Sequence, residues 1–189
     1  MIAFFLIALV MLAADLTLKH WSFNHVAHRP IGLTAANAHS PDLIPPHEGL
    51  TIVPSVLQLR LTVNHGAVFG LGGGGRWFFI AITFVAIAVI TAMFWRSPRN
   101  AWLMHIALAL ILAGALGNLY DRLRFGVVRD MLHLFPGVKL PFGWQWPGGI
   151  DELYPWIFNI ADVSLCVGVV IIVVLMLRSE QKGEKKARA

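Results

Sequence analysis

Four long runs of apolar residues dominate the pattern of this chain. Each is long enough to cross a hydrocarbon core of about 30 Å, which takes about 20 residues of helix. The pattern therefore predicts four membrane-spanning helices, at 1–18, 77–95, 101–120 and 156–177. All tryptophans and tyrosines lie at the ends of these runs or in the flanking loops. This distribution is typical of a membrane protein, because both side chains favour the membrane–water interface.

Between the first two runs the pattern changes its period. Residues 51–69 contain a stretch, Leu57 to Asn64, in which apolar and polar side chains alternate strictly. This period is typical of a β-strand with one buried face, and the glycines at 72–75 should end it before the second helix. Residues 25–50 show no sustained period and predict an irregular insertion. The other long loop, 121–155, mixes proline, glycine and tryptophan, which favours a segment on the membrane surface.

The composition supports four membrane spans, and the distribution of basic residues predicts their orientation in the membrane. Hydrophobic residues make up 57% of the chain and charged residues 13%, unlike a soluble domain. Basic residues concentrate in the short 96–100 loop and in the tail at 178–189. The positive-inside rule then places both termini and the 96–100 loop in the cytoplasm, with loops 20–76 and 121–155 outside. A net charge of +5 is explained by a basic tail beside anionic lipid, so we expect no nucleic-acid partner.

Two other features of the runs have simple interpretations. The first run lacks a basic leading segment and a small-residue cleavage site, so we expect it to be retained as a span rather than removed as a signal peptide. The single cysteine, Cys166, lies within the fourth run and has no neighbouring histidine there. We interpret it as a helix-packing residue and not as a nucleophile. The whole chain, 1–189, is expected to form one membrane-embedded domain.

Asp130 and Asp162 are the strongest candidates for chemistry. Each lies in or beside an apolar run, where an ionisable side chain is costly and usually functional. Two acids brought together in such surroundings can share one proton, so that one acts as a base while the other donates. Asn159 precedes Asp162 by three residues, and we place both on one face of the fourth helix. The asparagine amide would then orient a carboxyl group.

Polar residues on the first helix and after the predicted strand form a second group. Asp15 and Lys19 are four residues apart and share a helix face, either as an interfacial ion pair with Lys19 reaching outward or as support for an active site. Asn64 and Gly66 follow the alternating stretch. They are either a simple turn or a turn that lines a substrate groove.

The polar residues at the end of the third run also have two possible interpretations, one functional and one structural. Gly114 and Asn118 fall on one helix face with Gly117 close by, and small residues there allow a neighbouring helix to approach closely. Asn118 and Arg122 are again four apart and are placed to hold a carboxylate. Asp121 and Arg122 are alternatively a plain interfacial ion pair.

Histidines do not suggest a metal centre. Six of the eight lie in or at the edge of the first long loop, but none has the helical spacing of a metal-binding motif. The glycines at 72–75 lack the lysine that follows in a phosphate-binding loop. We expect no metal and no organic cofactor.

Taken together, the polar blocks resemble bacterial lipoprotein signal peptidase, also called signal peptidase II. The blocks that carry the resemblance are Asp15 with Lys19, then 64–70 (NHGAVFG), 114–122 (GALGNLYDR), 127–130 (VVRD) and 158–162 (FNIAD). They occur in the family's order from the first run to the fourth. The resemblance implies a mainly α, four-span enzyme with a small extracytoplasmic β-cradle. It also implies an aspartic endopeptidase with the catalytic dyad Asp130 and Asp162, supported by Asp15, Lys19, Asn64, Gly66, Asn118, Arg122 and Asn159.

The sequence departs from the family's pattern at several places. Ala113 stands where the family usually has the first of two glycines, and Arg129 replaces the usual apolar residue before the catalytic aspartate. Both outer loops are longer than expected. If the Arg129 side chain turned toward Asp130, its charge would favour the ionised carboxylate.

The function implied by the resemblance is specific. The enzyme would remove the signal peptide from a diacylglyceryl-modified prolipoprotein in the bacterial inner membrane, cutting just before the lipidated cysteine. One aspartate would deprotonate a water while the other polarises the scissile carbonyl. Membrane lipid and the prolipoprotein are the expected partners of a monomer. Two alternatives remain, a proton-coupled transporter, which usually needs more spans, and a non-catalytic membrane scaffold.

Overall fold

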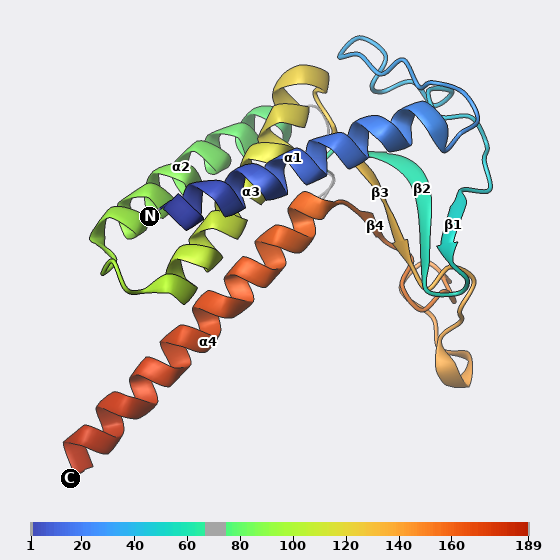
Figure 1. Ribbon diagram of the computed structural model, residues 1–189. Coiled ribbons are helices and arrows are strands. Elements are labelled where there is room, and N and C mark those ends of the chain that lie inside the picture. The colour runs from blue at the N-terminus through green and yellow to red at the C-terminus, as the bar shows by residue number, and fades with distance from the viewer. Residues whose placement is uncertain (1, 67–74, 189) are drawn as a thin grey trace. The chain divides into compact units, whose positions relative to one another are not determined.

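The computed structural model describes residues 2–66 and 75–188 and contains four long helices and a four-stranded antiparallel sheet in those ranges (Figure 1). The helices are α1 (Ile2–His25), α2 (Gly75–Arg96), α3 (Trp102–Phe125) and α4 (Ile160–Arg188). The strands are β1 (Leu50–Val53), β2 (Leu57–Asn64), β3 (Val128–Leu134) and β4 (Ile157–Phe158), and a short 3-10 helix, η1, covers Pro141–Gly143.

All four helices are long and apolar enough to cross a membrane, with mean hydropathy from 1.8 to 2.9 in their most apolar windows. The predicted fold class, four transmembrane helices with a small sheet, is therefore confirmed. The helices α1 and α3 run several residues past the apolar runs, to His25 and Phe125. They continue there because the polar side chains of these extra turns, such as Lys19 and Asp121, are buried inside the protein.

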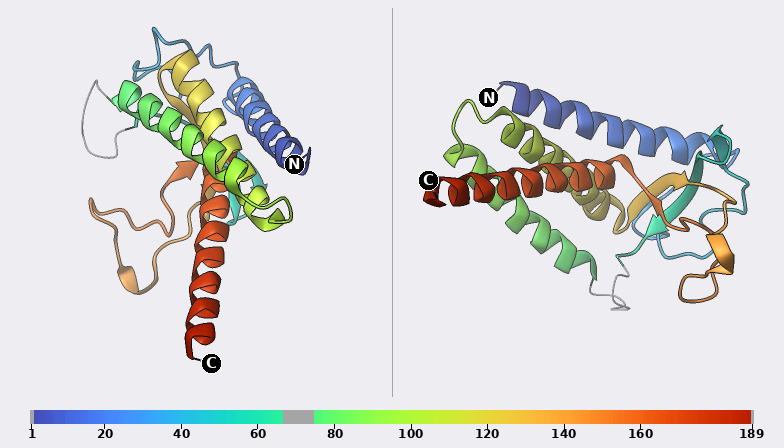
Figure 2. Two further views of the ribbon diagram at one scale, coloured as in Figure 1. Left: turned by 90° about the vertical axis from the view of Figure 1, so that its left-hand side faces the viewer. Right: turned by 90° about the horizontal axis from the view of Figure 1, so that it is seen from below.

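The chain divides into two compact units. The first comprises Met1–Asp15, Ile80–Leu119 and Ile160–Ala189. Its core forms where Phe4 and Ala8 of α1 meet Ile90 and Phe94 of α2 and Leu108 of α3. The rings of Phe4 and Phe94 stack with centroids 4.0 Å apart. Figure 2 shows these helices side by side, with the last turns of α4 extending beyond them.

The second unit comprises Leu16–Phe79 and Tyr120–Asn159 and contains the whole sheet. The strand order β1-β2-β3-β4 follows the chain order, and a register shift between Leu59 and Thr62 marks a bulge in β2. Its core contains Phe23 at the end of α1, Leu59 and Leu61 of β2, and Met131 of β3. Long loops before β1 and between β3 and β4 complete this unit (Figure 1).

The sheet differs from the prediction in two ways. The stretch from Leu57 to Asn64 is a strand, as predicted, but residues 50–53 form a separate strand before a turn in which Ser55 has a φ of 56°. Residues 67–69 of the predicted strand region, and 72–74 of the glycine run, lie outside the described residues. The third strand, β3, had no alternating signal because its first four residues are all buried.

The start of α4 also corrects the sequence analysis. The helix begins at Ile160, and residues 157–158 form β4 instead of the first helical turn. Asn159 therefore precedes the helix and does not share a helical face with Asp162. Its side chain points instead toward β3, as described below.

Candidate active site

Asp130 lies in the middle of β3 and is almost completely buried, with 1% of its surface exposed. The Nδ2 amide of Asn159 donates to Asp130 Oδ1 over 2.5 Å and also donates to the carbonyl oxygen of Arg129 over 3.3 Å. Asn159 has no exposed surface. The amide thus contacts the carboxyl group and the backbone beside it, which fixes the direction in which the Asp130 carboxyl group points.

Asp162 lies in the first turn of α4 and is partly buried. Asn118 of α3 donates from Nδ2 to Asp162 Oδ1 over 2.8 Å. A carboxylate in the first turn of a helix is also stabilised by the partial positive charge of the helix N-terminus. The asparagine placed by sequence analysis to hold a carboxylate therefore binds the carboxylate of Asp162.

Asp15 supports the same end of α4. It is 1% exposed, and its Oδ1 accepts a hydrogen bond from the backbone N–H of Ala161 over 2.9 Å. The first backbone N–H groups of a helix have no partner within the helix, so Asp15 satisfies a donor that burial would otherwise leave costly.

Two glycines of α3 allow this close approach, as the sequence predicted. A Cβ on Gly114 would collide with the carbonyl oxygen of Ala161. A Cβ on Gly117 would lie 2.5 Å from Asp15 Oδ2 and 3.3 Å from the Ala161 side chain. The start of α4 therefore packs directly on the glycine face of α3.

In the second unit, Asp121 is the centre of a buried ion cluster. Its Oδ2 lies 3.4 Å from Lys19 Nζ, and its Oδ1 accepts from the Arg129 guanidinium over 2.8 Å. The backbone N–H of Arg129 donates to Asp121 Oδ2 over 2.9 Å. Lys19 and Asp121 have no exposed side-chain surface, so the interpretation of Lys19 as reaching outward is wrong.

This cluster also settles two questions raised by the sequence. The alternative of a plain interfacial pair with Arg122 does not describe Asp121, which is buried and contacts Lys19 and Arg129. The Arg129 guanidinium binds Asp121 and lies 4.7 Å from the centre of the Phe125 ring. The Arg129 guanidinium is therefore paired with the Asp121 carboxylate. The backbone N–H of Arg129 bonds to the same carboxylate and anchors β3 immediately before Asp130.

Asn64 and Gly66 form a turn at the end of β2. The Gly66 N–H donates to Asn64 Oδ1 over 2.9 Å, and Gly66 has a φ of 76°, which favours glycine. A Cβ at Gly66 would lie 2.6 Å from the ring of Phe79. The turn is confirmed, whereas its role in a substrate groove stays a prediction. Residues 67–70 of this block lie outside the described residues.

Arg122 lies at the end of α3, with its guanidinium carbon 4.8 Å from the centre of the Phe79 ring. This distance is typical of a cation–π contact. Phe79 therefore contacts Arg122 and limits the space at Gly66, two of the residues assigned to the supporting group.

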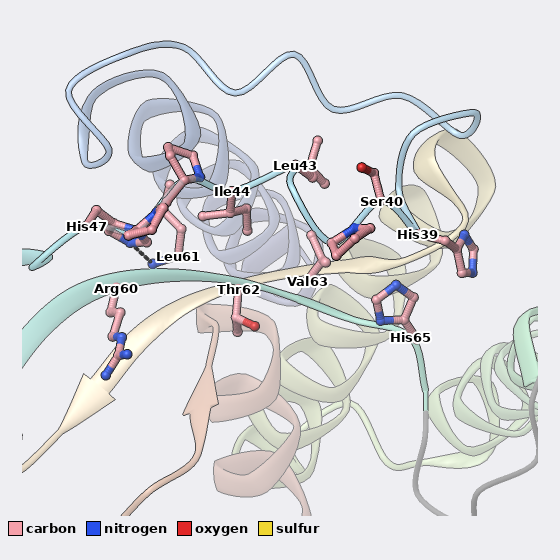
Figure 3. Close-up of a pocket in the computed structure, with 13 residues that line it drawn as sticks. His39, Ser40, Leu43, Ile44, His47, Arg60, Leu61, Thr62, Val63 and His65 are labelled. Atoms are coloured by element: carbon pink, nitrogen blue, oxygen red, sulfur yellow. Dashed lines mark hydrogen bonds between the residues drawn. The ribbon is translucent and has the colours of Figure 1, made fainter.

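The long insertion before β1 contributes a pocket of about 530 Å³ that the sequence analysis did not find (Figure 3). Leu61 and Val63 of β2 point toward the insertion, whereas Arg60 and Thr62 point away from it (Figure 3). The His47 Nε2 accepts a hydrogen bond from the Leu61 N–H over 2.9 Å, and its Nδ1 lies 2.9 Å from the Pro45 carbonyl oxygen. The imidazole of His47 therefore bridges the insertion and the backbone of β2 at Leu61.

Comparison with known proteins identifies the family. The family model described as signal peptidase (SPase) II matches residues 7–178. The chain belongs to the signal peptidase II family. Among the relatives, the lipoprotein signal peptidase of Desulfitobacterium hafniense is 36% identical over 138 residues, covering 73% of this chain and 80% of that protein. The lipoprotein signal peptidase of Latilactobacillus sakei is 30% identical over 181 residues, covering 96% of this chain and 97% of that protein.

Solved structures agree with this assignment. A bacterial membrane enzyme determined by the in meso method at 2.3 Å resolution matches with a TM-score of 0.68 and 27% identity, covering 95% of this chain and 90% of that one. A second in meso structure, at 1.9 Å, gives the same TM-score and identity. The fold and the family together make this signal peptidase II protein a membrane peptidase, so the transporter and scaffold alternatives lose their support.

Proposed function

We propose that this protein is a lipoprotein signal peptidase that removes the signal peptide from diacylglyceryl-modified prolipoproteins and cuts just before the lipidated cysteine. The proposal is supported by family membership over most of the chain and by relatives of that name at 30–36% identity. No metal ion or organic cofactor takes part. The chemistry falls to side chains of the protein.

Asp130 and Asp162 act as an aspartic dyad in this proposal. The observation that supports it best is that each aspartate receives a hydrogen bond from an asparagine amide, Asp130 from Asn159 and Asp162 from Asn118. An amide donor that holds a carboxyl group in one orientation suits a group that gains and loses a proton during each cycle.

The reaction uses the two carboxyl groups in opposite protonation states. The ionised aspartate removes a proton from a water molecule, which attacks the scissile carbonyl while the protonated aspartate donates a hydrogen bond to the carbonyl oxygen. When the tetrahedral intermediate collapses, the proton passes to the leaving amine. Because the two acids titrate as a pair, their pKa values belong to the dyad and not to either residue alone.

Chain connectivity supports the pairing of these two acids. Asn159 binds Asp130, and Asp162 follows Asn159 by three residues. Three residues of chain span at most about 10 Å, so the segment that orients one carboxyl group also carries the other.

The remaining shell residues support the dyad in this proposal. Asp15 holds the start of α4 through the Ala161 N–H, and Lys19 contacts Asp121 in the cluster that anchors β3. Asn64 and Gly66 shape a turn for the substrate peptide, with Arg122 beside them on Phe79. The protein works as a monomer in the bacterial inner membrane, with both termini in the cytoplasm and the dyad toward the outer face.

The experiment that tests this function uses purified protein and a prolipoprotein carrying the diacylglyceryl group, with the products identified by mass spectrometry. We expect a single cut, on the N-terminal side of the lipidated cysteine. The matched control is the same prolipoprotein with that cysteine replaced by serine, which cannot be lipidated and should not be cut. Cleavage of both substrates at equal rates, or of neither, would contradict the proposal.

A further inference from the structure

The loop between β3 and β4 contains a stiff hairpin, residues 138–153, referred to below as the 138–153 hairpin. Its two arms are joined by backbone hydrogen bonds from Leu140 N to Asp151 O and from Leu153 N to Val138 O, both 2.7 Å long. Near its tip, Trp146 N donates to Ile150 O over 2.8 Å. These backbone bonds connect the two arms along the length of the hairpin.

The tip of this hairpin is apolar and exposed. Residues 140–150 carry no charged side chain. Phe142 is 89% exposed, Trp144 66% and Ile150 44%, and the rings of Phe142 and Trp144 lie 6.0 Å apart. Large apolar side chains gathered on one exposed segment mark an interaction surface in a soluble setting or a contact with lipid.

The charged residues of the hairpin lie at its base, where Lys139 and Asp151 form an ion pair. Lys139 Nζ lies 2.7 Å from Asp151 Oδ2. The Glu152 carboxylate accepts from the Gly137 N–H over 3.0 Å and lies 3.4 Å from His133 Nε2. The hairpin therefore combines an uncharged aromatic tip with an ion-paired base, a polarity gradient along one short element.

We propose that the tip of the 138–153 hairpin inserts into the headgroup region of the bilayer that the helices of this protein cross. Tryptophan and phenylalanine favour that region because it accepts apolar rings together with polar indole N–H groups. The hairpin ends seven residues before α4, the last membrane span, begins at Ile160, and a connection of that length spans at most about 25 Å. This inference does not depend on the proposed function.

The composition of the hairpin tip indicates lipid and not a protein as its partner. A protein-binding surface normally combines apolar anchors with polar and charged groups at its rim, which set the partner's orientation. Residues 140–150 offer aromatic rings, proline and glycine, and their only side-chain amide is Gln145. A surface of this kind is matched by the lipid interface, which requires no fixed orientation of its partner.

A depth measurement tests this inference. The exposed Cys166 is replaced by serine, and a single nitroxide label is attached to cysteine at position 142 (Phe142→Cys) in full-length protein in phosphatidylcholine nanodiscs. The matched control carries the label at the exposed strand residue 51 (Thr51→Cys), in the same compact unit. Collision rates with oxygen, which concentrates in lipid, and with a water-soluble nickel chelate are then measured by electron paramagnetic resonance.

We expect the label at position 142 to collide more with oxygen and less with the nickel chelate than the label at position 51. Adding Trp144→Asp should shift the label at 142 toward the aqueous values, because a carboxylate is excluded from lipid. Equal aqueous accessibility at both positions would overturn the inference. Shielding at 142 that arises only after a lipidated prolipoprotein is added would also overturn it, since the tip would then bind substrate.

Discussion

The Asn159 amide donates to Asp130 Oδ1 over 2.5 Å, although 29 residues separate the two in the chain. The contact joins the residue just before α4 to the middle of β3. It gives the first candidate acid a fixed orientation, and a substitution at Asn159 should therefore change chemistry more than folding.

Replacing Asn159 by alanine should lower kcat by about 10- to 100-fold. The variant loses the amide that orients the Asp130 carboxyl group, and each 1.4 kcal/mol of lost transition-state stabilisation corresponds to about a tenfold change in rate. Steady-state cleavage of a lipidated prolipoprotein measures the change. Asn24→Ala is the matched control, because Asn24 is only partly buried and its amide bonds to the His20 carbonyl within α1. If both variants keep wild-type kcat, the Asn159 contact has no part in the reaction.

Replacing Asp15 by alanine should destabilise the protein by about 1–2 kcal/mol, as for the loss of a helix N-terminal cap. The reason is that the buried Ala161 N–H loses its acceptor. Asp15→Asn keeps an oxygen there and should recover part of the stability. Thermal unfolding in detergent measures the effect, with the exposed Thr17→Ala on the same helix as control. Equal melting temperatures for Asp15→Ala and Thr17→Ala would show that the bond is not stabilising.

Removal of Asp121 should be the most destabilising change in the buried ion cluster. Asp121→Leu removes the carboxylate that both Lys19 and Arg129 contact, and loss of one partner from a buried ion pair typically costs about 3–5 kcal/mol. Arg129→Leu should cost less, because Lys19 still lies beside Asp121. The double variant should lose less stability than the sum of the two single losses. Denaturation of all three variants gives this coupling, and a strictly additive result would mean that Asp121 and Arg129 do not stabilise each other.

The base of the 138–153 hairpin should open at acid pH. The hydrogen bond and charge of Asp151 raise the pKa of Lys139 above its ordinary value, and the hydrogen bond from Lys139 lowers the pKa of Asp151 below its ordinary value. The lowered carboxyl pKa gives stability above the unfolded value, about pH 4, that is lost as pH falls. The raised amine pKa gives stability below about pH 10.4 that is lost as pH rises.

Hydrogen exchange at the Leu140 and Leu153 amides measures this opening, because both bond across the hairpin base. Protection, corrected for the intrinsic exchange rate, should stay constant from about pH 5 to pH 9 and fall as the pH drops below about 4 toward the lowered pKa of Asp151. Asp151→Asn should show at every pH the low protection that the wild type reaches only in acid. It should therefore show no acid transition. A wild-type acid transition that persists in Asp151→Asn would assign it to another group.

The sequence was sufficient for features that depend on local pattern. Four apolar runs predicted four spans, and strict alternation predicted β2. The small residues Gly114 and Gly117 predicted close helix packing, because a missing side chain leaves room whatever the partner is. These inferences needed no knowledge of which segment lies opposite.

Features set by distant partners were not predictable in the same way. β3 lacks alternation because its polar residues Arg129, Asp130 and His133 are buried together with its apolar ones, so neither face of the strand is left to solvent. The apolar run beginning at Trp156 looked helical throughout, yet Ile157 pairs with His133 as a strand. The sequence offered only its neighbour Arg122 as an alternative partner for Asp121, whereas Asp121 contacts Lys19, which lies on another helix far away in the chain.

The most direct test of the central claim compares wild type with Asp130→Asn and Asp162→Asn in cleavage of a diacylglyceryl-modified prolipoprotein. Asparagine keeps the shape of each side chain and removes its acidic proton. The proposed dyad predicts that wild type cuts before the lipidated cysteine, while both variants fold, melt near the wild-type temperature and show no cleavage. Cleavage at the wild-type rate by either folded variant would contradict the assignment of Asp130 and Asp162 as the catalytic pair.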